Sequence, residues 1–534
     1  MSVSRRSLMR TSLAAGATAT LPGIVRAQTS APDARTLRVV MAGDLRVFDP
    51  IWTTANITSY HASMVYDTLF SADANFKAQP QMVGKWGVSD DKKTYTFELR
   101  DGLGWHDGTP VTAADCVASI RRWGEVDPGG QAILARASDI SKKDDKTFVI
   151  VLKQPFGLLL DELAKPVPRC CFVMREKDAR KPATEQVSEN IGSGPFIFNQ
   201  RLAKPGASYT YDRNPKYVPR NEPPSGLAGG KVAKVDQVIW DNIADDQTAM
   251  AALQAGEIDF YEAPPLDLIA QLAADPNIKV EVLNKNGNIG IMRMNWLHKP
   301  FSELPARQAL LYLVDQNSFM KASFGDPKWY RPVASIFGND TPMSTDVNTD
   351  WIKHGVDLDK ARQLFKDAGY AGETVAVLQA TNRPFMSNSE QLIAAQLKKI
   401  GVNAQLAPSD WGGVITRRAN QGPVDKGGWD IFVTSDSDYS HSDPLGVSTL
   451  MANGLQSWYG WPSNAPYEAL RTQWADADTL EDRQQIAKKM QQLAWDFVPT
   501  IQLGQYFSPV AYRANVKGML GMPEIIPLWN VEKT

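Results

Sequence analysis

The sequence predicts an α/β protein built from more than one domain. The main observation is the segment 373–438, in which three short apolar runs alternate with two helical patterns. A β-α-β-α-β order favours a parallel sheet with right-handed crossovers. Strand patterns with period two occur elsewhere in the chain, and 534 residues correspond to about three or four domains.

Within that segment, Ser387 and Glu390 have the spacing of a capping box at the start of the first helix, and Gly401 ends it. The expected elements are a strand at 374–379, a helix at 388–400, a strand at 402–406, a helix at 411–420 and a strand at 429–433.

The N-terminal half shows further elements. Alternating or apolar runs predict strands at 36–41, 94–100 and 147–152. Thr112 and Asp115 have capping-box spacing, which predicts that a helix begins there. The segment 213–230 is rich in Pro, Gly and Asn, so we expect an irregular surface loop.

Composition excludes several classes of protein. Hydrophobic residues make up 43% and charged residues 22%, which is typical of a globular protein rather than a disordered one. The net charge of −2 gives no basic field for nucleic acid. Three cysteines exclude a scaffold built on disulfides. Cys116 pairing with Cys170 or Cys171, and three buried thiols, both remain open.

The first 27 residues have the three parts of an export signal. Arg5 and Arg6 form a twin-arginine run, a mildly apolar stretch follows, and Ala27 ends a small-residue cleavage site. We expect Tat export to the Gram-negative periplasm with cleavage after Ala27. Cleavage removes four of the 57 basic residues and no acidic one, which leaves 53 against 59 and a net charge of −6. No later run reaches about 18 apolar residues, so the mature chain is expected to be soluble.

Polar side chains follow the three predicted strands of the 373–438 segment. In parallel sheets, ligands bind outside the carboxyl ends of the strands. Those ends are followed by Arg383, by Trp411, and by Asp436 and Asp438. A guanidinium fits a carboxylate, a carboxylate fits an ammonium, and an indole gives a flat apolar wall, so a zwitterion such as a short peptide fits the set. The alternative is that Arg383 pairs with one of the aspartates or is solvated in a loop.

Motifs of catalysis are missing. The sequence has no G-x-S-x-G, H-E-x-x-H, P-loop or C-x-x-C motif. Asp436, Asp438, His441 and Asp443 are candidate metal ligands, but the run lacks the glycine and the distal Glu of an EF-hand. We therefore expect no enzyme activity, no cofactor and no metal, and keep an exported hydrolase or metalloenzyme as a remote alternative.

An ordered series of motifs covers nearly the whole mature chain. Examples are VYDTLF at 65–70, WHDGTPVTAAD at 105–115, GSGPF at 192–196 and ALQAGEID at 252–259. Further blocks lie at 86–91, 95–102, 307–310 and 360–370. Together they resemble the family 5 solute-binding proteins of ABC transporters, which include dipeptide, oligopeptide and nickel binders. The resemblance implies a two-lobed periplasmic binding protein fold of class II, or cluster C, with a third domain and an interlobe ligand cleft.

The resemblance also implies a domain organisation and partners. The expected parts are a signal peptide at 1–27, a first lobe at 28–70, 186–285 and 500–534, an additional domain at 71–185 and a second lobe at 286–499. The protein is expected to be a monomer that captures a di- or oligopeptide and delivers it to a permease and ATPase complex in the inner membrane. The alternative cargo is a non-peptide metabolite or a metal chelate.

The resemblance assigns roles to single residues. Arg383, in the stretch NRPF, is similar to the arginine that holds the peptide carboxylate, and Asp438 resembles the aspartate that takes the ammonium. The spacing around 434–444 departs from the family pattern, which leaves Asp436 as the alternative acid. Trp411 and Tyr439 would contact the apolar body of the ligand, and His441 completes the candidate set.

Overall fold

The computed structural model describes residues 35–534. The predicted signal peptide, with Arg5, Arg6 and Ala27, lies outside the described residues. Within the described residues, no helix is long and apolar enough to cross a membrane.

The first of two large sheets has seven strands and is mixed. Strand β1 (Thr36–Val40) pairs in parallel with β12 (Gln237–Asp241) and β13 (Phe260–Tyr261), while the other pairs are antiparallel. The sheet order is β10-β11-β12-β1-β13-β21-β14. The remaining strands are β10 (Phe196–Phe198), β11 (Ser208–Arg213), β21 (Val510–Arg513) and β14 (Ile278–Glu281).

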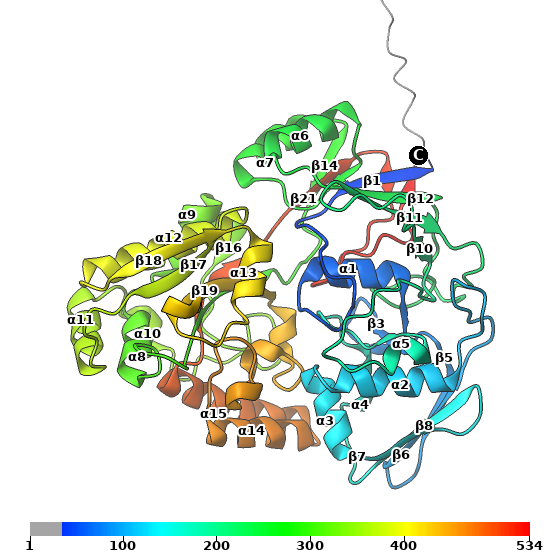
Figure 1. The fold of residues 1–534 in the computed structure, drawn as a ribbon, viewed down its shortest axis with the longest axis horizontal. Coiled ribbons are helices and arrows are strands. Elements are labelled where there is room, and N and C mark those ends of the chain that lie inside the picture. Colours follow the sequence, from blue (N-terminus) through cyan, green and yellow to red (C-terminus); the bar gives the residue numbers. More distant parts are fainter. Residues whose placement is uncertain (1–34) are drawn as a thin grey trace, which may run out of the picture. The chain divides into compact units, whose positions relative to one another are not determined.

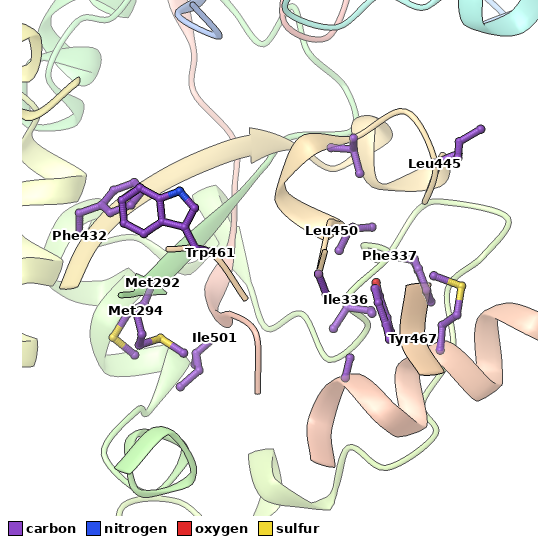
Figure 2. Close-up of a cluster of buried hydrophobic side chains, with 14 of the residues drawn as sticks. Met292, Met294, Ile336, Phe337, Phe432, Leu445, Leu450, Trp461, Tyr467 and Ile501 are labelled. Atoms are coloured by element: carbon purple, nitrogen blue, oxygen red, sulfur yellow. The ribbon is translucent and has the colours of Figure 1, made fainter. Parts of the chain in front are cut away.

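The second large sheet has six strands in the order β16-β20-β15-β19-β17-β18. Strand β17 is parallel to β18 and β19, and β15 is antiparallel to β19 and β20. The strands are β16 (Tyr330–Arg331), β20 (Ile501–Tyr506), β15 (Asn288–Met294), β19 (Ile431–Ser437), β17 (Val375–Ala380) and β18 (Ala404–Ser409). Figure 2 shows part of the hydrophobic core around this sheet, where Met292, Phe432 and Ile501 are buried.

The predicted β-α-β-α-β unit is confirmed in the second sheet. Helix α12 (Pro384–Lys399) joins β17 to β18 and packs on both, and α13 (Trp411–Arg417) joins β18 to β19 (Figure 1). The predicted start of α12 was wrong, because Pro384 at the first helical position fixes φ and the helix begins there. Glu390 is therefore inside the helix. Its carboxyl group accepts hydrogen bonds from the N–H groups of Ala380 and Val433 instead of capping, and burial raises its pKa to about 8.

A smaller antiparallel sheet lies within the expected additional domain, in the order β5-β6-β8-β7. It packs against α2 (Ala113–Gly124), which begins with the predicted capping box of Thr112 and Asp115. The strands are β5 (Val83–Val88), β6 (Thr94–Leu99), β8 (Thr147–Leu152) and β7 (Ala137–Lys142).

The remaining elements complete the chain. The helices are α1 (Asn56–Val65), α3 (Pro128–Arg136), α4 (Leu159–Ala164), α5 (Glu176–Ala179), α6 (Asp246–Ala255), α7 (Leu266–Ala274), α8 (Leu304–Leu311), α9 (Gln316–Phe324), α10 (Asp350–Lys353), α11 (Leu358–Asp367), α14 (Ala465–Asp476) and α15 (Leu480–Phe497). The short strands are β2 (Asp67–Thr68), β3 (Phe70–Ala72), β4 (Ala78–Pro80), β9 (Phe172–Val173), β22 (Val516–Lys517) and β23 (Glu532–Lys533).

The order of strands along the chain gives the two-lobed α/β fold. The chain completes β1 to β14 of the seven-stranded sheet, forms the whole six-stranded sheet, and then returns with β21. We call the parts that carry these two sheets the first and the second lobe. The expected return at residue 500 is too early, because β20 (Ile501–Tyr506) pairs with β15 and β16 in the second lobe.

Two further expectations concern the cysteines and the segment 213–230. Cys116, Cys170 and Cys171 are free, buried thiols. The segment 213–230 is irregular after β11, as predicted, but the stretch 226–230 is buried rather than on the surface. Gly229 has a positive φ of 79°, and a Cβ there would lie 2.2 Å from the Pro223 carbonyl oxygen, so glycine permits this close packing.

Candidate ligand-binding site

The carboxyl ends of β17, β18 and β19 carry the predicted site residues. Strands β17 and β18 end in register at Ala380 and Ser409, so the loops after them are neighbours. The Trp411 N–H donates a hydrogen bond of 2.7 Å to the Asn382 side-chain oxygen. The segments of Arg383 and Trp411 are therefore held together at one edge of the second lobe.

Arg383 contacts the first lobe. It is half-buried, and its Nη2 donates a hydrogen bond of 2.6 Å to the Ala42 carbonyl oxygen. Its Nε and Nη1 groups make no hydrogen bond within residues 35–534. Glu262 accepts hydrogen bonds from the Ala42 N–H at 2.6 Å and from the Tyr60 hydroxyl at 2.8 Å. Burial raises the pKa of Glu262, although the charge of Arg383 opposes the shift.

We call the contacts of the second lobe with the first lobe and with the expected additional domain the interlobe seam. On one side lie Ala42, Arg46 and Thr54 of the first lobe and Phe76 of the additional domain, and on the other lie Arg383, Asp410, Arg418 and Tyr439. One such contact is the 2.6 Å ion pair of Arg46 with Asp410. The Asp410 side chain also caps α13, because it accepts a hydrogen bond from the Gly413 N–H. The predicted site residues thus lie at or near the interlobe seam.

Asp436 and His441 form a pair. The Asp436 Oδ2 accepts a hydrogen bond of 2.6 Å from the Thr449 hydroxyl and lies 3.3 Å from the His441 Nε2. The His441 Nδ1 lies 2.6 Å from the Ile336 carbonyl oxygen, so both ring nitrogens face acceptors and the doubly protonated ring satisfies both. Burial opposes charge on both groups, but their attraction prevails: the pKa of His441 is raised and that of Asp436 lowered.

The two candidate aspartates have different environments. Asp438 is 0% exposed, and its oxygens accept hydrogen bonds from the N–H groups of Asn339 at 2.7 Å and Asp340 at 3.0 Å. The Asp436 side chain is 23% exposed, and its Oδ1 makes no hydrogen bond within the described part of the chain. The carboxylate that keeps an accessible oxygen is that of Asp436.

Tyr439 has one ring face covered. Its ring stacks on that of Phe76, with centroids 3.7 Å apart and an interplanar angle of 18°. Nearby, Glu524 accepts hydrogen bonds from the Ser437 N–H, the Ser440 hydroxyl and the Asn56 side chain. Burial, followed by the charge of Asp436, raises the pKa of Glu524 to about 7.

Both opposite charges of the site influence the Tyr506 hydroxyl. Burial raises the pKa of this hydroxyl to about 12; Arg383 lowers this pKa, whereas Glu524 and Asp436 raise it. The ring itself packs on Phe385 of α12, with centroids 4.8 Å apart. Arg383 and Asp436 therefore act on the same hydroxyl group from the ends of two neighbouring strands.

Sequence reasoning missed Glu262, Glu524 and Arg418. The first two come from segments far from 373–438 and reach the seam only through the fold. Arg418 follows Arg417 at the end of α13, where a cation is usually solvated, yet it is 2% exposed. No local pattern separates these two arginines in the sequence.

The cluster at 436–443 does not form a metal centre. Among residues 35–534, no three or more His, Cys, Asp or Glu side chains are arranged to hold a metal ion. His441 uses its nitrogens on Ile336 and Asp436, and Asp438 uses its oxygens on the backbone.

Comparisons with known proteins agree on one family. The family model of bacterial extracellular solute-binding proteins, family 5, matches residues 77–457. The chain is 56% identical over 536 residues to the "Probable peptide ABC transporter periplasmic-binding protein y4tO" of Sinorhizobium fredii, and the match covers 100% of both chains.

Solved structures share the fold. One is the binding protein AgaA of A. tumefaciens R10 in complex with agropinic acid, with a TM-score of 0.78, 22% identity, and coverage of 93% of this chain and 99% of that one. Another is the dipeptide-binding protein of Pseudoalteromonas sp. SM9913 in complex with Met-Leu, with a TM-score of 0.76, 21% identity, and coverage of 93% and 100%. At these identities, the structural likeness establishes the fold alone.

Proposed function

The chain belongs to the bacterial extracellular solute-binding proteins of family 5, and from this premise we propose that it binds a short peptide between its lobes. It is the substrate-binding component of an ABC transport system and not an enzyme. Membership of the family does not define the ligand, because two solved proteins with this fold hold agropinic acid and Met-Leu.

The observation that carries the proposal is a pair of opposite charges on two neighbouring parallel strands, with Arg383 just after β17 and Asp436 near the end of β19. Arg383 has unbonded guanidinium donors, and Asp436 has an accessible oxygen. Both groups act electrostatically on the Tyr506 hydroxyl. A zwitterion placed across this tyrosine meets a cation with its carboxylate and an anion with its ammonium, which is the pattern of a peptide with free ends.

Each predicted residue receives a role. Arg383 holds the peptide carboxylate, and Asp436, oriented by His441, accepts the ammonium. Trp411, which is half-buried, contacts the apolar body. Asp438 holds the turn at 338–340 instead of the ligand, since backbone N–H groups occupy both oxygens. Tyr439 links the second lobe to the expected additional domain through Phe76.

Location and partners follow from the same premise. The family and the 56%-identical relative are extracellular or periplasmic binding proteins. We infer that the chain enters the periplasm after cleavage at Ala27 and acts there as a monomer. The protein with its ligand would then dock on a permease and ATPase complex of the inner membrane.

Isothermal titration calorimetry with Ala-Phe, N-acetyl-Ala-Phe and Ala-Phe-amide tests the roles of the two ends. Blocking either end leaves a buried charge unpaired, so each blocked peptide should bind at least about tenfold more weakly. R383Q should lose affinity for Ala-Phe and no longer distinguish it from the amide. R46Q is the matched control, because Arg46 also crosses the seam but pairs with Asp410. Unchanged binding by R383Q would refute the assignment.

The bound ligand can also be identified directly. Native mass spectrometry of protein purified without denaturation should release a mixture of short peptides. A single non-peptide compound would keep the solute-binding function and remove the ammonium role of Asp436.

A further inference from the structure

Arg418 is a buried cation without an ionic partner. Its side chain leaves the end of α13 and is 2% exposed. Within residues 35–534 it makes no ion pair, and its Nε has no hydrogen-bond partner. Its Nη2 donates a long hydrogen bond of 3.3 Å to the Thr54 hydroxyl, across the interlobe seam, and the Tyr459 hydroxyl is a further hydrogen-bond partner of the guanidinium.

Four aromatic rings surround the Arg418 guanidinium. The distances from its Cζ to the ring centroids are 4.6 Å for Tyr459, 4.9 Å for Trp458, 5.6 Å for Trp411 and 5.8 Å for Phe432. Cation–π attraction offsets part of the cost of burying the charge. It does not satisfy the N–H donors, which point in the plane of the guanidinium and need acceptors there.

A second guanidinium, that of Arg169, lies near Tyr459 and Arg418. Arg169, from the expected additional domain, has a buried Nε without a partner and one hydrogen bond of 3.1 Å to the Val126 carbonyl oxygen. Tyr459 favours the charged form of both arginines, and the charge of Arg169 disfavours that of Arg418. The guanidinium groups of Arg169 and Arg418 therefore share the hydroxyl of Tyr459 as a neighbour.

The nearby acid does not neutralise this pair. Asp436 is the anion that acts on Arg418, but it is already paired with His441 and bonded to Thr449. Burial lowers the pKa of Arg418 to about 10, so the group stays protonated at neutral pH. A buried, protonated guanidinium that has an unbonded Nε–H and no ionic partner, at a seam between lobes, is suited to an anionic oxygen supplied from outside the chain.

We propose that Arg418, supported by Arg169, binds a second carboxylate on the ligand and makes the site selective for acidic peptides. This inference rests on the proposed function and adds the substrate class to it. Arg383 takes the carboxylate at the end of the peptide, so the group for Arg418 is the carboxylate of an aspartate or glutamate side chain. The rings of Trp411, Trp458 and Tyr459 enclose the methylene groups that lead to it.

Matched peptide pairs test this selectivity. Isothermal titration calorimetry of the full protein is run with Ala-Glu against Ala-Gln and with Glu-Ala against Gln-Ala, which differ in one charge at nearly constant shape. For the wild type, the acidic member of at least one pair should bind about 30-fold more tightly or better, as expected for a desolvated charge pair. R418Q should reduce this ratio to about threefold or less.

Two further variants separate charge from folding. R417Q is the matched control, because Arg417 is adjacent and its guanidinium bonds to the carbonyls of Gly427 and Gly428 instead of facing the seam. It should keep the full selectivity. R418K keeps the charge if R418Q does not fold, and should retain an intermediate preference, since an ammonium lacks the planar fork.

The outcomes are distinct for the two proposals. Three results would overturn the role of Arg418 and leave the peptide function intact. They are equal binding of the acidic and amide peptides by the wild type, selectivity that survives in R418Q, and selectivity that disappears equally in R417Q. Binding of none of the four peptides overturns both proposals. Loss of selectivity in R418Q, with the full selectivity kept in R417Q, supports the acidic-peptide site.

Discussion

Tyr439 and Phe76 stack face to face across the interlobe seam, with ring centroids 3.7 Å apart and an interplanar angle of 18°. Tyr439 follows β19 of the second lobe, and Phe76 lies in the turn between β3 and β4. Phe76 has a positive φ of 60°, which is uncommon for an aromatic residue, so its ring is presented by a constrained turn. The stack joins segments that belong to different sheets.

Removal of this stack should weaken ligand binding without unfolding either lobe. An aromatic pair contributes about 0.5–1.5 kcal/mol beyond its buried area, so Y439A should bind a peptide ligand about threefold to tenfold more weakly, mainly through faster dissociation. Stopped-flow fluorescence measures the dissociation rate. Y439F keeps the ring and should behave as the wild type. A Y439A variant with unchanged dissociation would show that the stack does not help to retain the ligand.

Substitution of Asp438 should reduce the stability of the protein, whereas substitution of Asp436 should reduce ligand binding. D438N replaces an acceptor of two backbone N–H groups, and hydrogen bonds to charged groups contribute about 1.5–3 kcal/mol, so its free energy of unfolding should fall by that order. D436N should instead weaken peptide binding. Denaturant titration and calorimetry on both variants provide the comparison. If D438N alone lost affinity while its stability stayed unchanged, the roles would be reversed.

Much of the second lobe could be predicted from sequence. The apolar runs and helical spacing of 373–438 predicted the five elements of the parallel unit, because each element is amphipathic or buried as a whole. Capping was less predictable. Thr112 and Asp115 form the predicted capping box. Ser387 and Glu390 do not form one, because α12 begins one turn earlier, at Pro384.

The site itself was only partly predictable. The expectation that ligands bind beyond the carboxyl ends of parallel strands correctly predicted that the segments of Arg383 and Trp411 lie together. It could not predict which aspartate keeps an oxygen without a hydrogen bond. That choice depends on the turn at 338–340, which lies about a hundred residues away and occupies Asp438. The burial of Arg418 is likewise set by rings from three separate segments, including Phe432 and Trp458.

The three thiols should be unreactive in the native protein. Burial raises the pKa of Cys116, Cys170 and Cys171, so little nucleophilic thiolate forms at pH 8. We expect slow reaction with Ellman's reagent in the native state and three equivalents per chain in guanidinium chloride. One equivalent after unfolding without reductant would show that two of the three cysteines form a disulfide, and peptide mapping would show whether Cys116 is one of them.

A carboxyl pair between the expected additional domain and the second lobe should make stability depend on pH. Glu162 is buried beside Asp443, with Lys165 and Asp127 as the other charged neighbours. Lys165 bonds to Asp127 at 2.6 Å and to the Gly446 carbonyl oxygen at 3.1 Å, so one cation serves three acids. Burial, followed by the charge of Asp443, raises the pKa of Glu162 well above 4.5.

The direction of this pH dependence follows from the number of protons that the folded and the unfolded chain bind. Between pH 4.5 and the raised pKa, the folded chain binds a proton at Glu162 that the unfolded chain has lost, so the free energy of unfolding falls as pH rises. One proton corresponds to a loss of about 1.4 kcal/mol for each pH unit in this window. E162Q removes the titrating group, and its unfolding free energy should fall less steeply between pH 5 and 7 than that of the wild type. E257Q, at an exposed glutamate, removes the same charge and should keep the wild-type slope. Equal slopes in E162Q and the wild type, measured by urea titration at each pH, would show that Glu162 is ionised in the folded protein.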